Sequence, residues 1–358
     1  MIKQMNKKIF FILEGNSGAG YIFNAKDVAS IAESLKFYKA LTLKQKAMKN
    51  ALKLYLNGIG LLCKIFSLCT HLKDKNEIEQ YLEKLTELPM DFELDENCSI
   101  LISPTRDKII AHHHGAYFHK FAFGKSYEKV RNEAAIYKLL DRAFRHFRVS
   151  SLFELEEKEE DAFCSFKLGD RKRRNDKGKI DIVAALVEFF DVTRQEERPL
   201  SRYVETLEDK YAQSGLKCQA AKDVLKKLSN MNENALLPLG LVHRDFKPWN
   251  INDENGLLIY DFEEAVTEGL PLEDLFNFHI DPIVRYEAPE TVMTKAFSNA
   301  RQKEYERYLS LLGTEIDTAV LFRCYVVERI SFWRNENDDE TSEKFCSLLK
   351  YIEENMPL

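Results

Sequence analysis

Three side chains that could take part in a chemical reaction lie close together in the sequence: Asp245, Asn250 and Asp261. One short loop can carry both Asp245 and Asn250. A tight hairpin is predicted over Ile251–Tyr260, with Asn255-Gly256 at its turn, and would bring Asp261 back beside Asn250. A carboxylate that accepts a proton, next to two oxygen donors for magnesium, is the set required to move the γ-phosphate of ATP to a hydroxyl.

The neighbours of these residues carry a family resemblance. HRDFKPWN (243–250), IYDFEEA (259–265) and GLPLEDLFNF (269–278) resemble the motifs of the protein-kinase-like superfamily, in its aminoglycoside phosphotransferase and choline kinase-like branch. The resemblance implies an α+β, bilobal protein-kinase-like fold, with a small antiparallel-sheet N-lobe and a mainly helical C-lobe. It also implies ATP and Mg²⁺ as cofactors, Asp245 as catalytic base, and Asn250 and Asp261 as metal ligands.

Other residues of this block have expected roles beside those three. Lys247 is expected to neutralise the charge of the moving phosphoryl group. His243 is expected to brace the loop, and Trp249 to pack it, with substrate stacking as the alternative for Trp249. Glu263 and Asp274 resemble acidic residues of the family that fix loops more often than they bind metal.

Composition excludes several classes of protein. The chain has 358 residues, of which 45% are hydrophobic and 31% charged, as in ordinary globular proteins. A net charge of −6 and the lack of a basic stripe argue against nucleic-acid binding. Seven scattered cysteines without a CxxC pair favour reduced thiols in the cytoplasm. The apolar runs are too short for a secretion signal or a transmembrane segment.

Residues 1–96 are expected to form a separate, mainly helical cap of unknown role. Ile9–Leu13 suggests a strand, and the glycines of 15–20 a plain turn, because the GK[ST] of a phosphate loop is missing. Residues 27–72 are predicted to be helical, with apolar residues at helical spacing. A lysine-rich face here allows weak contact with a membrane surface as an alternative to a solvated face.

Residues 97–169 are expected to form the N-lobe with its hinge. Three strands are predicted at 99–102, 108–114 and 115–123, and two further strands over 151–169. Between them, a helix is predicted from about Glu128 to Phe147, with an apolar stripe that includes Phe144 and Phe147. The turn at 103–107, which resembles the phosphate-covering loop in position, contains no glycine.

Lys120 lies among aromatic residues on the third predicted strand, and a buried ammonium needs a partner. The candidate partner is Glu133, at the edge of the apolar stripe of the next helix. The resemblance implies that this pair positions the ATP phosphates, and that backbone groups of about Phe166–Leu168 bind adenine. The alternative is an edge lysine and a surface glutamate. The triplet His112–His114 is expected to be exposed strand rather than a metal site.

Residues 170–358 are expected to form the C-lobe with the catalytic loop. The arginine-rich run 171–174 is expected to be a solvated loop, with binding of an anionic acceptor as the alternative. A small-molecule hydroxyl acceptor, first of all a sugar or glycan, is favoured. The alternatives are a serine/threonine-type protein kinase, suggested by Ala288-Pro289-Glu290, and a pseudokinase or nucleotide-binding module without turnover. The sequence does not indicate an oligomeric state.

Overall fold

The computed structural model describes residues 9–14, 20–35, 43–66, 72–86, 97–169, 180–231, 236–253 and 256–356. The chain divides into two compact units. Unit 1 comprises residues 1–141 and 150–172, and unit 2 comprises residues 142–149 and 173–358. The segment 142–149 therefore interrupts unit 1 in the sequence.

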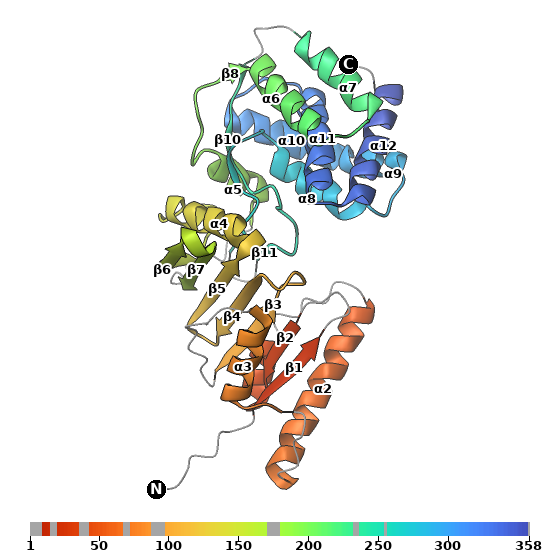
Figure 1. Ribbon diagram of the computed structural model, residues 1–358. Coiled ribbons are helices and arrows are strands. Elements are labelled where there is room, and N and C mark those ends of the chain that lie inside the picture. The colour runs from red at the N-terminus through yellow and green to blue at the C-terminus, as the bar shows by residue number, and fades with distance from the viewer. Residues whose placement is uncertain are drawn as a thin grey trace. The chain divides into compact units, whose positions relative to one another are not determined.

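Unit 1 is built on a seven-stranded antiparallel sheet with the order β1-β2-β3-β4-β5-β7-β6 (Figure 1). Its strands are β1 (Phe10–Glu14), β2 (Gly20–Asn24), β3 (Cys98–Ile102), β4 (Lys108–His113), β5 (Tyr117–Phe123), β6 (Ser151–Lys158) and β7 (Phe163–Gly169). The strands predicted in residues 97–169 are all present, with ends within two residues of the expected ones.

The N-terminal strands belong to this sheet, in contrast to the expected separate cap. β2 pairs with β3, with Gly20 opposite Ile102 and Ile22 opposite Ile100. The predicted boundary at residue 96 therefore lies inside unit 1. The reason is the alternation of apolar residues in both strands: Ile22, Ile100 and Ile102 are fully buried and need one common core.

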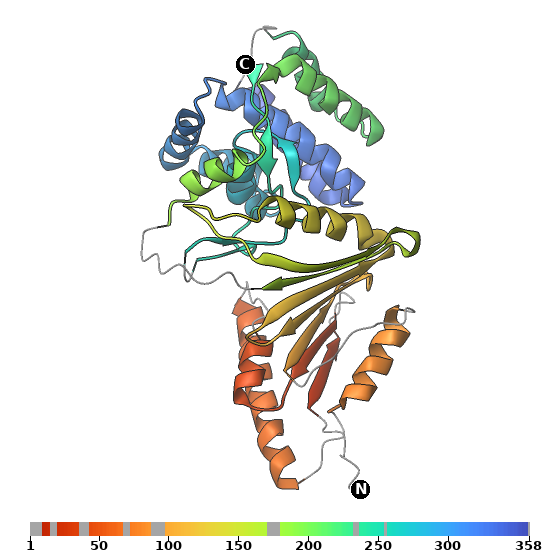
Figure 2. The ribbon, with the colours of Figure 1, turned by 90° about the vertical axis from the view of Figure 1, so that its left-hand side faces the viewer.

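Three helices cover the two faces of the N-terminal part of the sheet: α1 (Val28–Ser34), α2 (Leu43–Phe66) and α3 (Lys75–Thr86). Figure 2 shows α2 and α3 on opposite sides of the sheet. Ile78 and Leu82 of α3 pack against Ile22, Ile100 and Ile109 on one face. On the other face Phe23 packs with Ile31 of α1 and Leu56 of α2. The strands between these helices are therefore buried on both sides.

Helix α4 (Tyr127–Leu139) packs against β5, β6 and β7. It ends earlier than the periodicity predicted, because Phe144 and Phe147 lie beyond it and belong to unit 2. There the two rings stack at 4.2 Å, and Phe147 meets Phe189 edge-on. The apolar spacing therefore continues beyond Leu139, where α4 ends, into residues that are not helical.

Unit 2 is mainly helical in the part described (Figure 1). Its helices are α5 (Ile182–Phe190), α6 (Leu200–Gln213), α7 (Gln219–Ser229), α8 (Glu273–Val284), α9 (Pro289–Ala296), α10 (Asn299–Leu312), α11 (Thr318–Asn335) and α12 (Asp339–Asn355). Ala288-Pro289-Glu290 begins α9, where a proline in the first turn loses no hydrogen bond.

Short strand pairs hold the loops of unit 2. β8 (Arg198–Pro199) pairs with β9 (Leu236–Leu237), and β10 (Gly240–Val242) with β13 (Val266–Gly269). β11 (Ile251–Asn252) pairs with β12 (Leu258–Ile259), which confirms the predicted hairpin. Gly256 has φ +87°, a conformation that favours glycine.

Candidate active site

The loop between β10 and β11 is fixed by hydrogen bonds from its first residues. The backbone N–H groups of His243 and Arg244 donate to the two carboxylate oxygens of Asp274 at 2.8 and 2.9 Å. The His243 ring contacts the Tyr260 carbonyl through Nε2 at 2.9 Å and the Asp245 N–H through Nδ1 at 3.3 Å. Asp274 and His243 therefore brace the loop, as predicted.

Asp245, Lys247 and Asn250 lie in mutual contact. The Asn250 amide nitrogen donates to both the backbone oxygen and Oδ2 of Asp245, at 2.9 and 2.7 Å. The Lys247 ammonium forms an ion pair with Oδ1 of Asp245. The Asp245 carboxylate is thus oriented from two sides, while its side chain remains 28% exposed and accessible to a ligand.

Behind the loop, Asp281 of α8 pairs with Lys247 at 2.8 Å and with Arg329 of α11 at 3.3 Å. Burial works against ionisation, but Arg329 and Lys247 together lower the pKa of Asp281 below its ordinary value. Lys247 also lies 5.7 Å from the ring centroid of Trp249 and 5.5 Å from that of Trp333. Asp281 therefore fixes the ammonium that contacts Asp245.

Arg244 turns away from Asp245 into the helices of unit 2. Its guanidinium binds Glu273 of α8 at 3.2 Å and Glu328 of α11 at 3.0 Å. Burial raises the pKa of Glu273 to about 7. Although burial has the same effect on Glu328, Arg244 and Lys210 lower its pKa to about 2. The Glu328 carboxylate is therefore the ionised anchor of Arg244.

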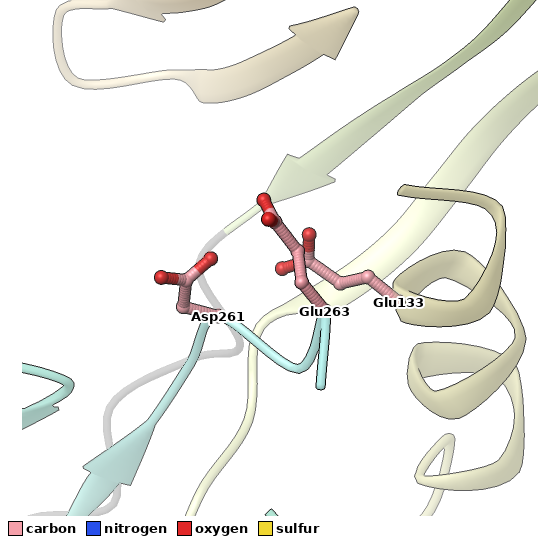
Figure 3. Close-up of side chains that lie close together, drawn as sticks. All are labelled: Glu133, Asp261 and Glu263. Carbon is pink, nitrogen blue, oxygen red and sulfur yellow. The ribbon is translucent and has the colours of Figure 1, made fainter. Parts of the chain in front are cut away.

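Asp261 directly follows the hairpin, and the Tyr260 N–H donates to the Asn250 carbonyl at 3.4 Å. Figure 3 shows Asp261 and Glu263 on this segment, where each offers a carboxylate oxygen within 4.8 Å of the other. Asp261 adopts φ +70° and Arg244 φ +62°, left-handed conformations that cost energy in residues other than glycine. Burial and the charge of Asp261 raise the pKa of Tyr260 to about 12.

In unit 1, Lys120 of β5 and Glu133 of α4 form an ion pair. Their side chains are only 7% and 2% exposed. Figure 3 shows Glu133 projecting from α4. Such a buried pair differs from an edge lysine beside a surface glutamate, so the structure brings together the two residues that the sequence singled out.

Phe166 and Leu168 differ from the prediction. β7 is an inner strand, where Phe166 is opposite Lys120 of β5 and Leu155 of β6. Its backbone groups are therefore used by the sheet rather than directed toward adenine. The Phe166 ring is fully buried and lies 5.9 Å from that of Tyr137 on α4. Leu168 is also paired on both sides, next to an irregularity of β6 between Leu152 and Glu154, and its side chain is half-buried.

The glycine-free turn at 103–107 is braced by its own side chains. Ser103 Oγ accepts the Lys108 N–H at 3.2 Å, and the Thr105 hydroxyl donates to Asp107. The backbone N–H groups of Ser103 and Arg106 also stay within the turn. Because Pro104 has no N–H, the turn offers phosphates fewer backbone donors than a glycine-rich loop does.

Two further predictions concern clusters of basic residues. His112 stacks on Phe118 at 4.3 Å and His113 on Tyr117 at 4.2 Å. The expected exposed strand is wrong, because β4 lies between β3 and β5 and His113 is buried. Within the described part of the chain, no histidine takes part in a group of three potential metal ligands. The arginine-rich run at 171–174 lies outside the described residues.

Three supporting residues were not singled out from the sequence: Asp281, Glu328 and Arg329. Asp281 follows Asp274 by two helical turns, a spacing that places both on one face of α8. Glu328 and Arg329 interrupt an apolar stretch of α11, and charges in such a place require partners. These two signals could have found all three residues.

Comparison with known proteins identifies the family. Residues 107–308, more than half of the chain, match the phosphotransferase enzyme family, abbreviated APH. The chain belongs to this family. It is a phosphotransferase that acts on a hydroxyl of a small molecule, and the sheet of unit 1 and the helices of unit 2 are the two lobes of its kinase-like fold.

Solved structures that are similar to this chain include three structures of aminoglycoside phosphotransferases. A thermostable mutant of APH(4)-Ia in complex with ADP and hygromycin B has 12% identity and a TM-score of 0.46, covering 78% of this chain and 99% of that one. A mutant of aminoglycoside 2'-phosphotransferase-IIIa with GDP has 10% identity and a TM-score of 0.47, covering 78% and 97%. The complex of APH(2")-IIia with GDP and kanamycin has 12% identity and a TM-score of 0.43, covering 70% of this chain and 91% of that one.

No curated protein gives a significant match to the sequence. Among the helices described, none is long and apolar enough to cross a membrane.

Proposed function

We propose that this phosphotransferase transfers the γ-phosphate of ATP, with Mg²⁺, to a hydroxyl group of a sugar or glycan. The observation that carries the proposal is the arrangement of Asp245, Lys247 and Asn250. Asp245 is held by an ammonium and an amide, while part of its carboxylate remains accessible. A base oriented beside a cation is the arrangement that transfer to a hydroxyl needs.

The donor atoms of unit 2 fit magnesium. Asn250 gives its amide hydrogens to Asp245, which leaves its amide oxygen as the metal-binding atom. Asp261 adds a carboxylate, and the Glu263 carboxylate is within 4.8 Å of it. Hard oxygen donors of this kind suit Mg²⁺, which usually keeps several waters and phosphate oxygens as its other ligands. Bound magnesium would offset the negative charge of the ATP phosphates.

Side chains of the protein accept the proton, stabilise the transferred group and bind the nucleotide in the proposed reaction. Asp245 accepts the proton of the acceptor hydroxyl as its oxygen attacks the γ-phosphorus, and the bond from that phosphorus to the bridging oxygen of ADP breaks. Lys247 is held at Asp245 by Asp281, where it stabilises the charge on the transferred group. Lys120, oriented by Glu133, binds phosphate oxygens of the nucleotide. Leu168 contributes an apolar contact to the base.

The acceptor class rests on the loop sequence. Pro248-Trp249-Asn250 resembles the loop of bacterial phosphotransferases that act on sugars or surface polysaccharides. In the structure Trp249 is half-buried, and its carbonyl accepts the Tyr260 hydroxyl at 2.8 Å. This bond fixes the backbone of Trp249 next to Asn250. An aromatic ring placed there offers a surface for the apolar face of a sugar.

Thermal unfolding with and without Mg-ATP tests the nucleotide site first. At a hundredfold excess over Kd, binding adds about 2.7 kcal/mol to the free energy of unfolding, which raises Tm by roughly a few degrees. We expect this shift in the wild type only with magnesium, and not in Asp261→Ala. Asp253→Ala, at an exposed position of the same hairpin, should retain it.

Release of ADP in the presence of a panel of sugars then tests the acceptor. Sugar-dependent release supports the proposal, and phosphate incorporated instead into a protein substrate would favour the protein kinase alternative. A magnesium-dependent shift without any acceptor-dependent release would favour a nucleotide-binding module. No shift in the folded wild type would contradict the proposed ATP site.

A further inference from the structure

Cys218 and Cys346 lie far apart in the sequence but come together in unit 2. Cys218 is the N-cap residue of α7, and Cys346 lies on α12, which packs against α7. Each thiol lies close enough to the other to influence its pKa. Both residues are half-buried and line the same surface pocket, together with Gln219, Asp223 and Ser347. A small oxidant therefore has access to both sulfur atoms.

The surroundings of Cys218 favour its thiolate. The neighbouring Cys346 thiol has the largest effect, and the N–H groups of Ala221 and Ala220 in the first turn of α7 act in the same direction. Together they lower the pKa of Cys218 to about 6, against the effect of burial. The neighbouring Cys218 raises the pKa of Cys346, which remains the protonated partner.

The backbone at Cys218 is also fixed. Its N–H donates to the Tyr211 hydroxyl at 2.7 Å, and that hydroxyl donates to the Cys218 carbonyl at 2.9 Å. Other thiols differ in their environment: burial raises the pKa of Cys164 to about 11 and that of Cys324 to about 12. Cys218 therefore combines access, orientation and thiolate character.

We propose that Cys218 and Cys346 are a site of reversible oxidation, at which a peroxide converts the two thiols into a disulfide that joins α7 to α12. The Cys218 thiolate attacks one peroxide oxygen, the O–O bond breaks, and one water leaves after protonation. This step leaves a sulfenic acid on Cys218. The Cys346 sulfur then attacks the Cys218 sulfur, the S–O bond breaks, and a second water leaves. Two thiols and one hydrogen peroxide thus give one disulfide and two waters.

The helices joined by this bond already have polar links. Glu353 of α12 pairs with Lys227 of α7 and, at 2.7 Å, with Arg323 of α11. Since α7 and α12 are in contact before oxidation and both cysteines line one pocket, a disulfide would join helices that are already neighbours. It closes a long loop of the chain, the case in which a cross-link restricts the unfolded state most.

The test is oxidation of the full-length, reduced protein with hydrogen peroxide, followed by alkylation of remaining thiols and peptide mapping by mass spectrometry. We expect a peptide pair joined through Cys218 and Cys346 that disappears on reduction. Cys346→Ser should instead accumulate sulfenic acid on Cys218, detected with a dimedone probe, and Cys218→Ser should leave Cys346 unmodified. Cys324→Ser is the matched control and should still form the joined peptides.

The disulfide should also raise Tm of the wild type by roughly several degrees, without a change in either serine variant. The proposal is overturned if both cysteines of the wild type remain fully alkylated while other thiols of the chain are oxidised. It is likewise overturned if hydrogen peroxide oxidises Cys218 no more than it oxidises the buried Cys164. None of these measurements depends on ATP or an acceptor, so they succeed or fail separately from the proposed function.

Discussion

At the scale of single residues, the organisation of the candidate site centres on Asp245. Its carboxylate contacts Lys247 and Asn250, and Lys247 is in turn held by Asp281. Each group therefore has a defined orientation before a ligand arrives, and in the proposed reaction such an arrangement would lower the cost of reaching the transition state.

Replacing Asp245 by Asn tests its role as base. The amide has nearly the same size but cannot take a proton from the acceptor, so we expect kcat to fall by about 10²- to 10⁴-fold. Nucleotide-induced stabilisation should persist. Asp253→Asn, on the exposed hairpin, is the control and should keep wild-type kcat. Equal kcat in the two variants would contradict the assignment of Asp245.

The pair Lys120–Glu133 allows structure and function to be separated. Either Lys120→Met or Glu133→Leu leaves one buried charge without this partner, so we expect each to lower the free energy of unfolding by about 3–5 kcal/mol. The double variant should regain most of that loss, because two apolar side chains pack in place of the pair. Chemical denaturation of the wild type, the two single variants and the double variant measures these free energies of unfolding.

If the pair serves nucleotide binding, the stable double variant should show a KM for ATP at least roughly tenfold above that of the wild type, since a charge-assisted contact is lost. An unchanged KM in that variant would assign the pair a purely structural role.

The contact of Asp245 with Asn250 and the hairpin that leads to Asp261 could be predicted because both follow from spacing along a short segment. The roles of the three residues in the reaction stay a proposal. Lys120 and Glu133 could be predicted because an isolated charge in an apolar strand requires a partner. Phe166 could not be placed correctly, since backbone availability depends on which strands flank β7, and that order is set by contacts far apart in sequence. The same holds for Arg329, which reaches Asp281 from another helix.

At the scale of elements, the strands β10 and β13 support the loop that carries Asp245 through two glycines. Gly240 lies opposite Gly269, and a Cβ on Gly240 would lie 2.5 Å from the carbonyl oxygen of Phe190 on α5. A Cβ on Gly269 would lie 1.9 Å from Val242. The absence of side chains lets β10 approach α5 and β13 closely, which fixes where the loop begins.

Gly240→Ala should therefore destabilise the fold, because backbone must move to admit the methyl group. We expect a loss of about 1–3 kcal/mol in the free energy of unfolding, with lower kcat from displacement of the loop. Gly58→Ala on α2, where no atom lies within 4 Å, should instead add about 0.5–1 kcal/mol. Urea unfolding of both variants checks the opposite signs, and a stable Gly240→Ala protein would refute this account.

Helix lengths also show what the sequence pattern can and cannot give. The periodicity of residues 130–147 predicted one helix, yet α4 ends at Leu139 because Phe144 and Phe147 pack into unit 2. Apolar spacing reports which residues are buried, but not the core to which they contribute.

At the scale of the whole molecule, the two units share a sensitivity to acid. In unit 1, burial and the charge of Lys167 lower the pKa of His119 to about 3. In unit 2, burial and the charge of Arg301 lower the pKa of His279 to about 4. Both histidines are therefore neutral in the folded chain at pH values where they are protonated in the unfolded chain.

The sign of the effect follows from proton binding. Between about pH 6.5, the ordinary histidine pKa, and the lowered folded values, the unfolded chain binds more protons. The free energy of unfolding should fall as the pH falls through this window, by on the order of a few kcal/mol for the two histidines together. Melts at pH 7.5 and 5.0 measure the change. His119→Gln and His279→Gln should each make the free energy of unfolding depend less on pH. The same pH dependence in both variants as in the wild type would refute the attribution to these two histidines.

Strands β2 and β3 pair just outside the N-terminal limit of the segment that matches the family. The matched segment begins at residue 107, inside the sheet, whereas β3 is covered by β2 on its other side. A chain shortened to the matched segment and β3 would present the open backbone donors and acceptors of that strand to solvent, next to buried isoleucines. Exposed edges of this kind recruit strands from other molecules and cause aggregation. The N-terminal hairpin thus covers this edge of the matched part of the sheet.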